Sequence, residues 1–134
     1  MKLKLQILKD GETIFEMPLS FSDWRKEELE DELDSMEEEF QRLSRLFSAL
    51  SNMTRLMMMK RIMEEEDHTA SFTDFMRDLN LNPKLVREYT RKLSECGLLE
   101  KVGRGRYRCS ESGETSFIVL SLALRRLMEA FDRW

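Results

Sequence analysis

The stretch Leu79–Arg108, LNLNPKLVREYTRKLSECGLLEKVGRGRYR, decides the fold of this chain of 134 residues. It begins with a turn, after which Asn82 and Pro83 stand in an order that opens a helix. Asparagine can cap the free N–H groups, and proline suits the first helical position, where no N–H is needed. The helix is predicted to run to residues 95–96, and Gly97 ends it.

The residues after this helix predict a two-stranded β-ribbon. Leu98–Val102 is typical of a strand, the glycines of Gly103–Gly105 favour a turn, and Arg106–Ser110 is the predicted returning strand. Before the turn, Ser71 and Asp74 resemble a capping box at the start of a short helix. The predicted buried face of this short helix comprises Phe72, Phe75, Met76 and Leu79.

These elements follow the order of a winged helix-turn-helix. Another helix, Asn52–Glu66, precedes the short helix, and a loop over Asp67–Ser71 separates the two. In a helix-turn-helix the second helix enters the major groove of DNA, and its N-terminal residues face the edges of the bases. Residues 83–96 are therefore the predicted recognition helix, and residues 99–109 are the predicted wing.

Helical periodicity divides the recognition helix into two faces. The buried side holds Val86, Leu93 and one or both of Tyr89 and Thr90. The outer side holds Lys84, Arg87, Glu88 and Arg91. Arg87 and Arg91 lie four residues apart and share a stripe, and an arginine can donate two hydrogen bonds to guanine. Glu88 either accepts a hydrogen bond from cytosine or pairs with Lys84 or Arg91 in the free protein.

The predicted wing carries Arg104 between two glycines, with Arg106 and Arg108 on one face of its second strand. Glycine lets the backbone approach a phosphate, and arginine favours the narrow, negative minor groove. A plain β-hairpin with solvated arginines is the alternative, but the position directly after a basic helix favours a wing. The predicted DNA-binding residues are Asn82, Lys84, Arg87, Glu88, Arg91, Lys92, Lys101, Arg104, Arg106 and Arg108.

The net charge of −4 hides a strong asymmetry along the chain. Arg77–Arg108 holds nine basic and four acidic residues, whereas Asp23–Glu39 holds ten acidic and two basic residues. This division fits a protein that presents one face to a polyanion. Solvated helix faces are the alternative, in particular for the acidic run.

An N-terminal extension precedes the winged core. Residues 2–18 predict a β-hairpin around the turn Asp10-Gly11, and a long helix capped by Ser22 or Asp23 follows over 23–50. The apolar residues of this helix repeat as a heptad, which suits either a coiled-coil partner or packing within its own domain. They are Leu29, Leu33, Met36, Phe40, Leu43, Phe47 and Leu50.

A last helix, over about 113–131, is apolar nearly all round, which predicts burial against another helix or another subunit. The predicted dimerisation residues of the two helical extensions are Leu29, Leu33, Met36, Phe40, Phe117, Leu120, Leu124, Leu127 and Phe131. The predicted fold is mainly α with a small β part (α+β). Its segments are the hairpin 1–22, the acidic helix 23–50, the winged core 51–112 and the C-terminal helix 113–134.

The sequence lacks the residues that several classes of function require. One histidine, His68, and two cysteines, Cys96 and Cys109, cannot supply a four-ligand metal site, and no cofactor is expected. The sequence has no nucleophile–histidine set and no phosphate loop, so we expect no enzyme. The longest apolar run has ten residues, too few to cross a bilayer. Ten methionines and the lack of a secretion signal favour the cytoplasm.

Two segments resemble the ArsR-type winged-helix regulators. LFSALSNMTRLMMMKRIM (46–63) is similar to the family's ALxxPTRLxIL-like opening, although Met53 stands where proline is usual. FTDFMRDLNLNPKLVREYTRKLSECGLLEKVGRGRYRCSESG (72–113) is similar to the remaining core, so the resemblance covers roughly half of the chain. It implies a dimeric DNA-binding repressor. Metal-sensing members place cysteines in the short helix or histidines and acids on the last helix. FTDFMRDL has no cysteine and 117–134 has no histidine, so metal sensing is not implied.

These features together predict a sequence-specific transcriptional regulator that binds double-stranded DNA as a homodimer, without a membrane, metal or cofactor. The alternative is a winged-helix interaction module that binds another protein through the acidic heptad helix. The hairpin and this helix lie outside the minimal core of the family. They are therefore the parts expected to determine the choice of partner.

Overall fold

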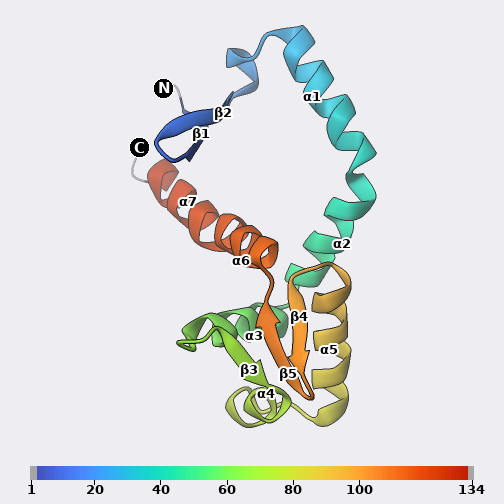
Figure 1. The fold of residues 1–134 in the computed structure, drawn as a ribbon. Helices are drawn as coiled ribbons and strands as arrows, with labels where there is room; N and C mark the ends of the chain where they lie inside the picture. Colours follow the sequence, from blue (N-terminus) through green and yellow to red (C-terminus); the bar gives the residue numbers. More distant parts are fainter. Residues whose placement is uncertain (1–2, 133–134) are drawn as a thin grey trace. The chain divides into compact units, whose positions relative to one another are not determined.

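The computed structural model describes residues 3–132, and the chain divides between Gln41 and Arg42 into two compact units. The first unit holds an N-terminal hairpin and an acidic helix. The second unit holds the elements of the predicted winged core and the C-terminal helix (Figure 1).

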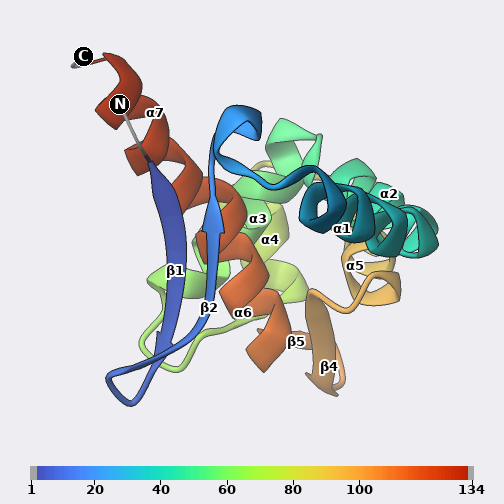
Figure 2. The ribbon, with the colours of Figure 1, turned by 90° about the horizontal axis from the view of Figure 1, so that it is seen from above.

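The N-terminal hairpin has the strands and the turn predicted from the sequence. β1 (Lys4–Lys9) pairs antiparallel with β2 (Glu12–Pro18), and the two strands lie side by side in Figure 2. Asp10 and Gly11 adopt φ values of +52° and +83°. Two successive positive φ values are the backbone of a tight two-residue hairpin turn, which glycine adopts without a steric penalty.

The long helix predicted over 23–50 is two helices in the structure, which corrects this prediction. α1 (Lys26–Glu38) is followed by its C-cap residue Glu39, and α2 (Phe40–Leu50) begins directly after Glu39. The boundary between the two helices falls among three consecutive glutamates, Glu37, Glu38 and Glu39. The heptad is therefore interrupted after Met36.

α1 begins after Arg25, and not at the predicted caps. Ser22 and Asp23 lie in the preceding 3-10 turn η1 (Phe21–Asp23) and neither caps the helix. No side chain of α1 is buried. Its apolar side chains, which are half-buried or exposed, are Leu29, Leu33 and Met36. The apolar side of the acidic helix therefore stays accessible.

The second unit confirms the predicted fold class, mainly α with a small β part. Its elements follow the order of a winged helix-turn-helix, α3–β3–α4–α5–β4–β5. Their bounds are α3 Met53–Glu64, β3 Thr69–Ser71, α4 Phe72–Asp78, α5 Pro83–Glu95, β4 Leu99–Gly103 and β5 Arg106–Cys109. In Figure 1, α5 lies alongside β4; α4 packs on α5 and β3, and α3 packs on β3 and β5.

A third strand, β3, joins the wing sheet where the sequence predicts only a loop. It pairs antiparallel with β5, from Thr69 opposite Arg108 to Ser71 opposite Arg106, so the strand order is β3–β5–β4. Three residues are too few to show an alternating pattern. The pairing also depends on a partner such as Arg106, which lies 37 residues after Thr69.

The core of the second unit joins α3, α4, α5 and the wing sheet. Phe75 of α4 is fully buried, and its ring centroid lies 6.4 Å from that of Tyr107 in β5. Methionines of α3 fill the space beside it, as suits a flexible apolar side chain. The buried apolar residues are Ala49, Met58, Met59, Ile62, Ala70, Phe75, Val86, Leu93, Leu98, Leu99, Cys109 and Phe117.

The C-terminal helix runs through α6 (Glu111–Phe117), a π-helical stretch η2 (Ile118–Ala123) and α7 (Leu124–Asp132). Ser110 caps it by accepting a hydrogen bond from Gly113 N–H at 2.9 Å. The sequence predicts burial, but much of the apolar surface is exposed in one chain. The exposed large apolar side chains are Ile118, Val119, Leu122, Leu124, Met128 and Phe131. No helix within residues 3–132 combines the length and apolar character needed to span a bilayer.

Gly113 lets the start of α6 pack directly on the backbone of Leu98. A Cβ at residue 113 would lie 2.3 Å from the Leu98 carbonyl oxygen. We expect Gly113→Ala to lower the free energy of unfolding by about 1–3 kcal/mol, because this clash outweighs the roughly 0.5–1 kcal/mol that alanine gains over glycine in a helix. Urea unfolding followed by circular dichroism measures the change.

Gly103→Ala is the matched control for this prediction. Nothing lies within 4 Å of a Cβ built at Gly103, and its φ is outside the left-handed region. We expect this variant to stay within about 0.5 kcal/mol of the wild type. Equal free energies of unfolding for the two variants would contradict the close packing of α6 on Leu98.

Candidate nucleic-acid interface

Side-chain caps fix the two helices of the helix-turn-helix. Ser71 and Asp74 form the predicted capping box: Asp74 N–H donates to Ser71 Oγ at 3.0 Å, and Ser71 N–H donates to Asp74 Oδ2 at 2.8 Å. Asn82 Oδ1 accepts from Leu85 N–H at 2.9 Å, and Pro83 is the first residue of α5. The predicted start of the recognition helix is therefore confirmed.

α5 has the two faces predicted from its periodicity. Val86, Thr90 and Leu93 are buried, and Tyr89 is half-buried. Thr90 Oγ1 donates to Val86 O at 2.7 Å, so this hydroxyl is satisfied inside the core. The exposed charged side chains of the other face are Lys84, Arg87, Glu88, Arg91 and Lys92. The fold thus presents a mainly basic helix face to solvent.

Most described cations outside α5 and the wing are paired with carboxylates. Arg61, for example, lies 2.5 Å from Glu65 and 2.8 Å from Asp78. By contrast, five cations of α5 and the wing take part in no ion pair or side-chain hydrogen bond within residues 3–132. These five unpaired cations are Lys84, Arg87, Lys92, Lys101 and Arg104.

A carboxylate between two guanidinium groups joins α3 to α4. Arg77 Nε donates to Asp78 Oδ1 at 2.9 Å, and Arg61 Nε donates to Asp78 Oδ2 at 2.9 Å. The hydrogen bonds from Arg77 and then from Arg61 lower the pKa of Asp78 to about 2. Asp78 therefore stays ionised and balances the positive charge of Arg61 and Arg77.

Arg91 lies 3.8 Å from Glu95, one turn further along α5. The two side chains are 72% and 70% exposed, and an exposed pair of this kind contributes at most about 1 kcal/mol, so Arg91 can exchange its partner. Of the alternatives predicted for Glu88, an ion pair with Lys84 or Arg91 is not formed in the part of the chain that the structure describes. Its contact with cytosine stays a prediction.

The three arginines of the wing differ in their surroundings. Arg108 lies 2.7 Å from Glu100 on the neighbouring strand. Arg106 donates to Thr69 Oγ1 of β3 at 2.9 Å. Arg104 is exposed in the turn between the strands and belongs to the five unpaired cations. Of the three, Arg104 is therefore the one that can bind an anion without giving up a partner.

Arg55 is a buried cation to which the sequence assigns no role, although it is the arginine of the ALxxPTRLxIL-like segment 46–63. Its Nε donates to Ala49 O at 2.6 Å and its Nη2 donates to Ser48 O at 3.0 Å, while its Cζ lies 5.1 Å from the ring centroid of Tyr89. The side chain thus joins the end of α2 to α3 and α5. One signal could have found it, because Arg55 stands four and seven residues before two core residues of α3, on the buried face.

Cys96 and Cys109 are free thiols. Burial raises the pKa of Cys96, and burial together with the charge of Glu114 raises the pKa of Cys109 to about 11. A redox-sensing cysteine needs an accessible thiolate, so neither thiol has that character. Among residues 3–132, no three His, Cys, Asp or Glu side chains are grouped to hold a metal ion.

The comparisons with known proteins are sparse. No family model and no curated protein matches this chain. Among solved structures, the chain is similar to an "ArsR-like Transcriptional Regulator from Rhodococcus sp. RHA1", with 26% sequence identity over 70% of this chain and 86% of that chain and a TM-score of 0.49.

Proposed function

We propose that this chain is a sequence-specific transcriptional regulator, a cytoplasmic repressor that binds double-stranded DNA as a homodimer. α5 lies in the major groove, and the wing lies on the backbone or in the minor groove. The observation that carries the proposal is the set of five unpaired cations on α5 and the wing. Such cations on the second helix of a helix-turn-helix suit phosphates and base edges, even in a chain of net charge −4.

The cations divide into base readout and phosphate contacts. Arg87 and Arg91 are assigned to readout, because they share the exposed stripe of α5 and an arginine can donate to both O6 and N7 of guanine. Phosphate contacts supply affinity without sequence information. They are assigned to Lys84, Lys92, Lys101 and Arg104. Arg106 and Arg108 are assigned a smaller share of the affinity for DNA, because each would first have to break its contact with Thr69 or Glu100.

The homodimer is proposed to form through the C-terminal helix. This helix exposes large apolar side chains, and their burial against a second copy would be favourable. The residues proposed for one interface stripe are Leu120, Leu124, Leu127 and Phe131. Phe117, predicted with them, is 8% exposed and belongs to the core of its own chain, so it is left out of the interface.

Selection of bound duplexes from random DNA, with the mass of the complex measured in solution, tests this function. We expect a pseudo-palindromic site and two chains per duplex, because a two-fold dimer reads half-sites about one helical turn apart. A pool without enriched sequences, or a single chain on each duplex, would contradict the proposal.

Arg87→Ala is expected to weaken binding to the selected site by about 1–3 kcal/mol and to relax the base preference at one position of each half-site. Binding to a scrambled duplex should change much less, because phosphate contacts dominate it. Fluorescence anisotropy on both duplexes measures the two affinities. Lys92→Ala is the control and should weaken both equally. An equal loss on both duplexes for Arg87→Ala would remove its readout role.

The acidic helix α1 supports a second candidate, a module that binds another protein. None of its side chains is buried, and Leu33 and Met36 are 44% and 41% exposed among acidic residues. The break at Glu39 limits the stripe to α1, so Phe40 does not continue it. A gel shift on genomic fragments discriminates the candidates. No specific shift at moderate salt, together with a stable complex with another protein, would favour the interaction module.

A further inference from the structure

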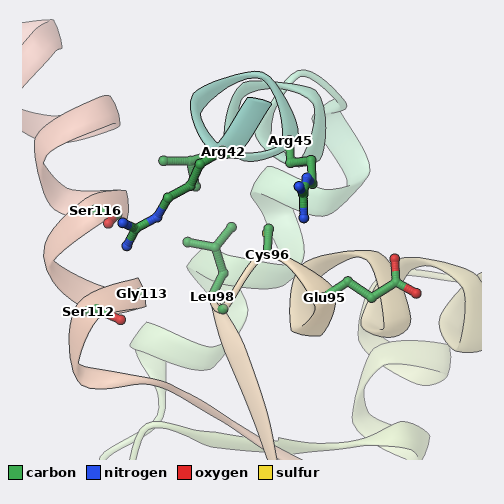
Figure 3. Close-up of a pocket in the computed structure, with 10 residues that line it drawn as sticks. Arg42, Arg45, Glu95, Cys96, Leu98, Ser112, Gly113 and Ser116 are labelled. Carbon is green, nitrogen blue, oxygen red and sulfur yellow. The ribbon is translucent and has the colours of Figure 1, made fainter. Parts of the chain in front are cut away.

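A hollow of about 470 Å³ lies within the second unit, between α2, the junction of α5 with β4, and the start of α6 (Figure 3). This volume falls within the range of about 300–1,000 Å³ that is usual for small-molecule sites. None of the residues assigned to DNA lines it. The hollow therefore has no role in the function proposed so far.

The α2 wall of the hollow carries two guanidinium groups. Arg42 and Arg45 are three residues apart on α2, so they project from one face of the helix. In Figure 3, Arg42 extends across the hollow toward Ser116, and Arg45 points down toward Cys96. The lining carboxylate, Glu95, turns away from the hollow in Figure 3 and lies 3.8 Å from Arg91. Arg45 forms no ion pair within residues 3–132, so it leaves an uncompensated positive charge at the hollow.

A smaller hollow beside it extends the positive charge. Its volume is about 250 Å³, and it shares Arg45, Glu95 and Cys96 with the larger hollow. Lys92 of α5, which is also assigned to a phosphate contact, lines this second part. Together the two parts hold three cations and one carboxylate, and the carboxylate is the group that lies beside Arg91.

The remaining wall divides into an apolar and a polar side. Leu46 of α2 and Leu98, directly before β4, supply apolar surface. Ser112 and Ser116 of α6 supply hydroxyl groups on the opposite side (Figure 3). An apolar surface with a few converging polar groups is the usual composition of a ligand site, in which the polar groups orient the ligand.

We propose that this hollow binds a small organic anion, a carboxylate carried on a compact apolar body of one or two rings. A guanidinium group can donate two parallel hydrogen bonds to a carboxylate, and Arg45, which forms no ion pair within residues 3–132, offers such a group. The hydroxyl of Ser116 is a further donor, and the apolar body covers Leu46 and Leu98. A neutral ligand of the same shape would desolvate Arg45 without a counter-charge, so the anion is preferred.

The proposed site adjoins the base of α5. Ser110 N–H donates to Leu98 O at 3.1 Å and Ser110 Oγ donates to Gly97 O at 2.5 Å, so the end of α5 is bonded to the start of α6. A ligand held between α2 and α6 adds contacts across this joint. Its binding is measurable without DNA, so failure of this site and failure of the proposed function are separate results.

Titration of the full chain with 2-naphthoate and with its neutral analogue 2-naphthamide tests the site. Calorimetry should give naphthoate at least about tenfold tighter binding than naphthamide, a difference of about 1.4 kcal/mol. Backbone amide shifts in NMR spectra should change around 95–98 and 112–116. Equal affinities for the two compounds, or shifts confined to other parts of the chain, would overturn the proposal.

Arg45→Gln should weaken naphthoate binding at least about tenfold and leave naphthamide unchanged, because only the anion uses the charge. Arg125→Gln, which removes an exposed arginine of α7, is the matched control and should bind naphthoate like the wild type. Arg45→Lys retains the charge, so its affinity for naphthoate should lie between that of the wild type and that of Arg45→Gln. Thermal melting checks that each variant is folded. Wild-type naphthoate affinity in folded Arg45→Gln would overturn the assignment of Arg45.

Discussion

Raising the salt concentration from 50 to 200 mM is expected to weaken binding to the selected duplex by about 10³–10⁵-fold. Each lysine or arginine on a phosphate releases a condensed counterion from DNA, and salt opposes that release. Four unpaired cations per chain are assigned to phosphates, which makes about eight contacts per dimer and a slope of log K against log salt of about −7. Anisotropy over a salt series measures the slope.

Single substitutions identify which cations contribute to the slope of log K against log salt. Arg104→Gln should reduce its magnitude by about 1.8, because each dimer loses two phosphate contacts. Arg108→Gln is the matched control in the same wing. Since Arg108 already lies 2.7 Å from Glu100, its loss should change the slope much less. A slope near zero in the wild type, or equal slopes for the two variants, would contradict the assigned phosphate contacts.

The parts of the fold that sequence reasoning predicted correctly depend on residues close together along the chain. The capping box of Ser71 and Asp74 spans three residues, as does the bond from Leu85 N–H to Asn82. Gly97, with φ of +81°, ends α5 because this backbone conformation is easy for glycine. Each of these signals combines a residue type with a local bond, so spacing alone is enough to predict it.

The features that sequence reasoning missed depend on distant or competing contacts. β3 forms because Thr69–Ser71 pairs with β5, and no residue within 67–71 indicates that pairing. The heptad predicted a continuous helix through Glu39, but a periodic apolar stripe does not indicate the break between α1 and α2. The pairing of Arg106 and Arg108 is also tertiary, so sequence alone ranks them equal to Arg104.

Arg55→Ala is expected to lower the free energy of unfolding by about 2–4 kcal/mol. The guanidinium caps the C-terminal end of α2, which carries the negative end of the helix dipole: it donates to the Ala49 carbonyl and to the Ser48 carbonyl, which also accepts from Ser51. Hydrogen bonds to a charged group contribute about 1.5–3 kcal/mol each, and alanine would remove two of them. It would also remove the contact with Tyr89, which supports α5 from its buried side.

Lys60→Ala is the matched control on the exposed face of α3. Lys60 lies 2.8 Å from Glu64 with 68% of its side chain exposed, so its loss should change the free energy of unfolding by less than about 0.5 kcal/mol. Arg55→Met keeps most of the apolar stem but removes both guanidinium donors and leaves the Ala49 carbonyl without its hydrogen bond, so it should remain close to Arg55→Ala. If Arg55→Met instead matched the wild type in urea unfolding, packing of the stem, and not the cap on α2, would be the role of Arg55.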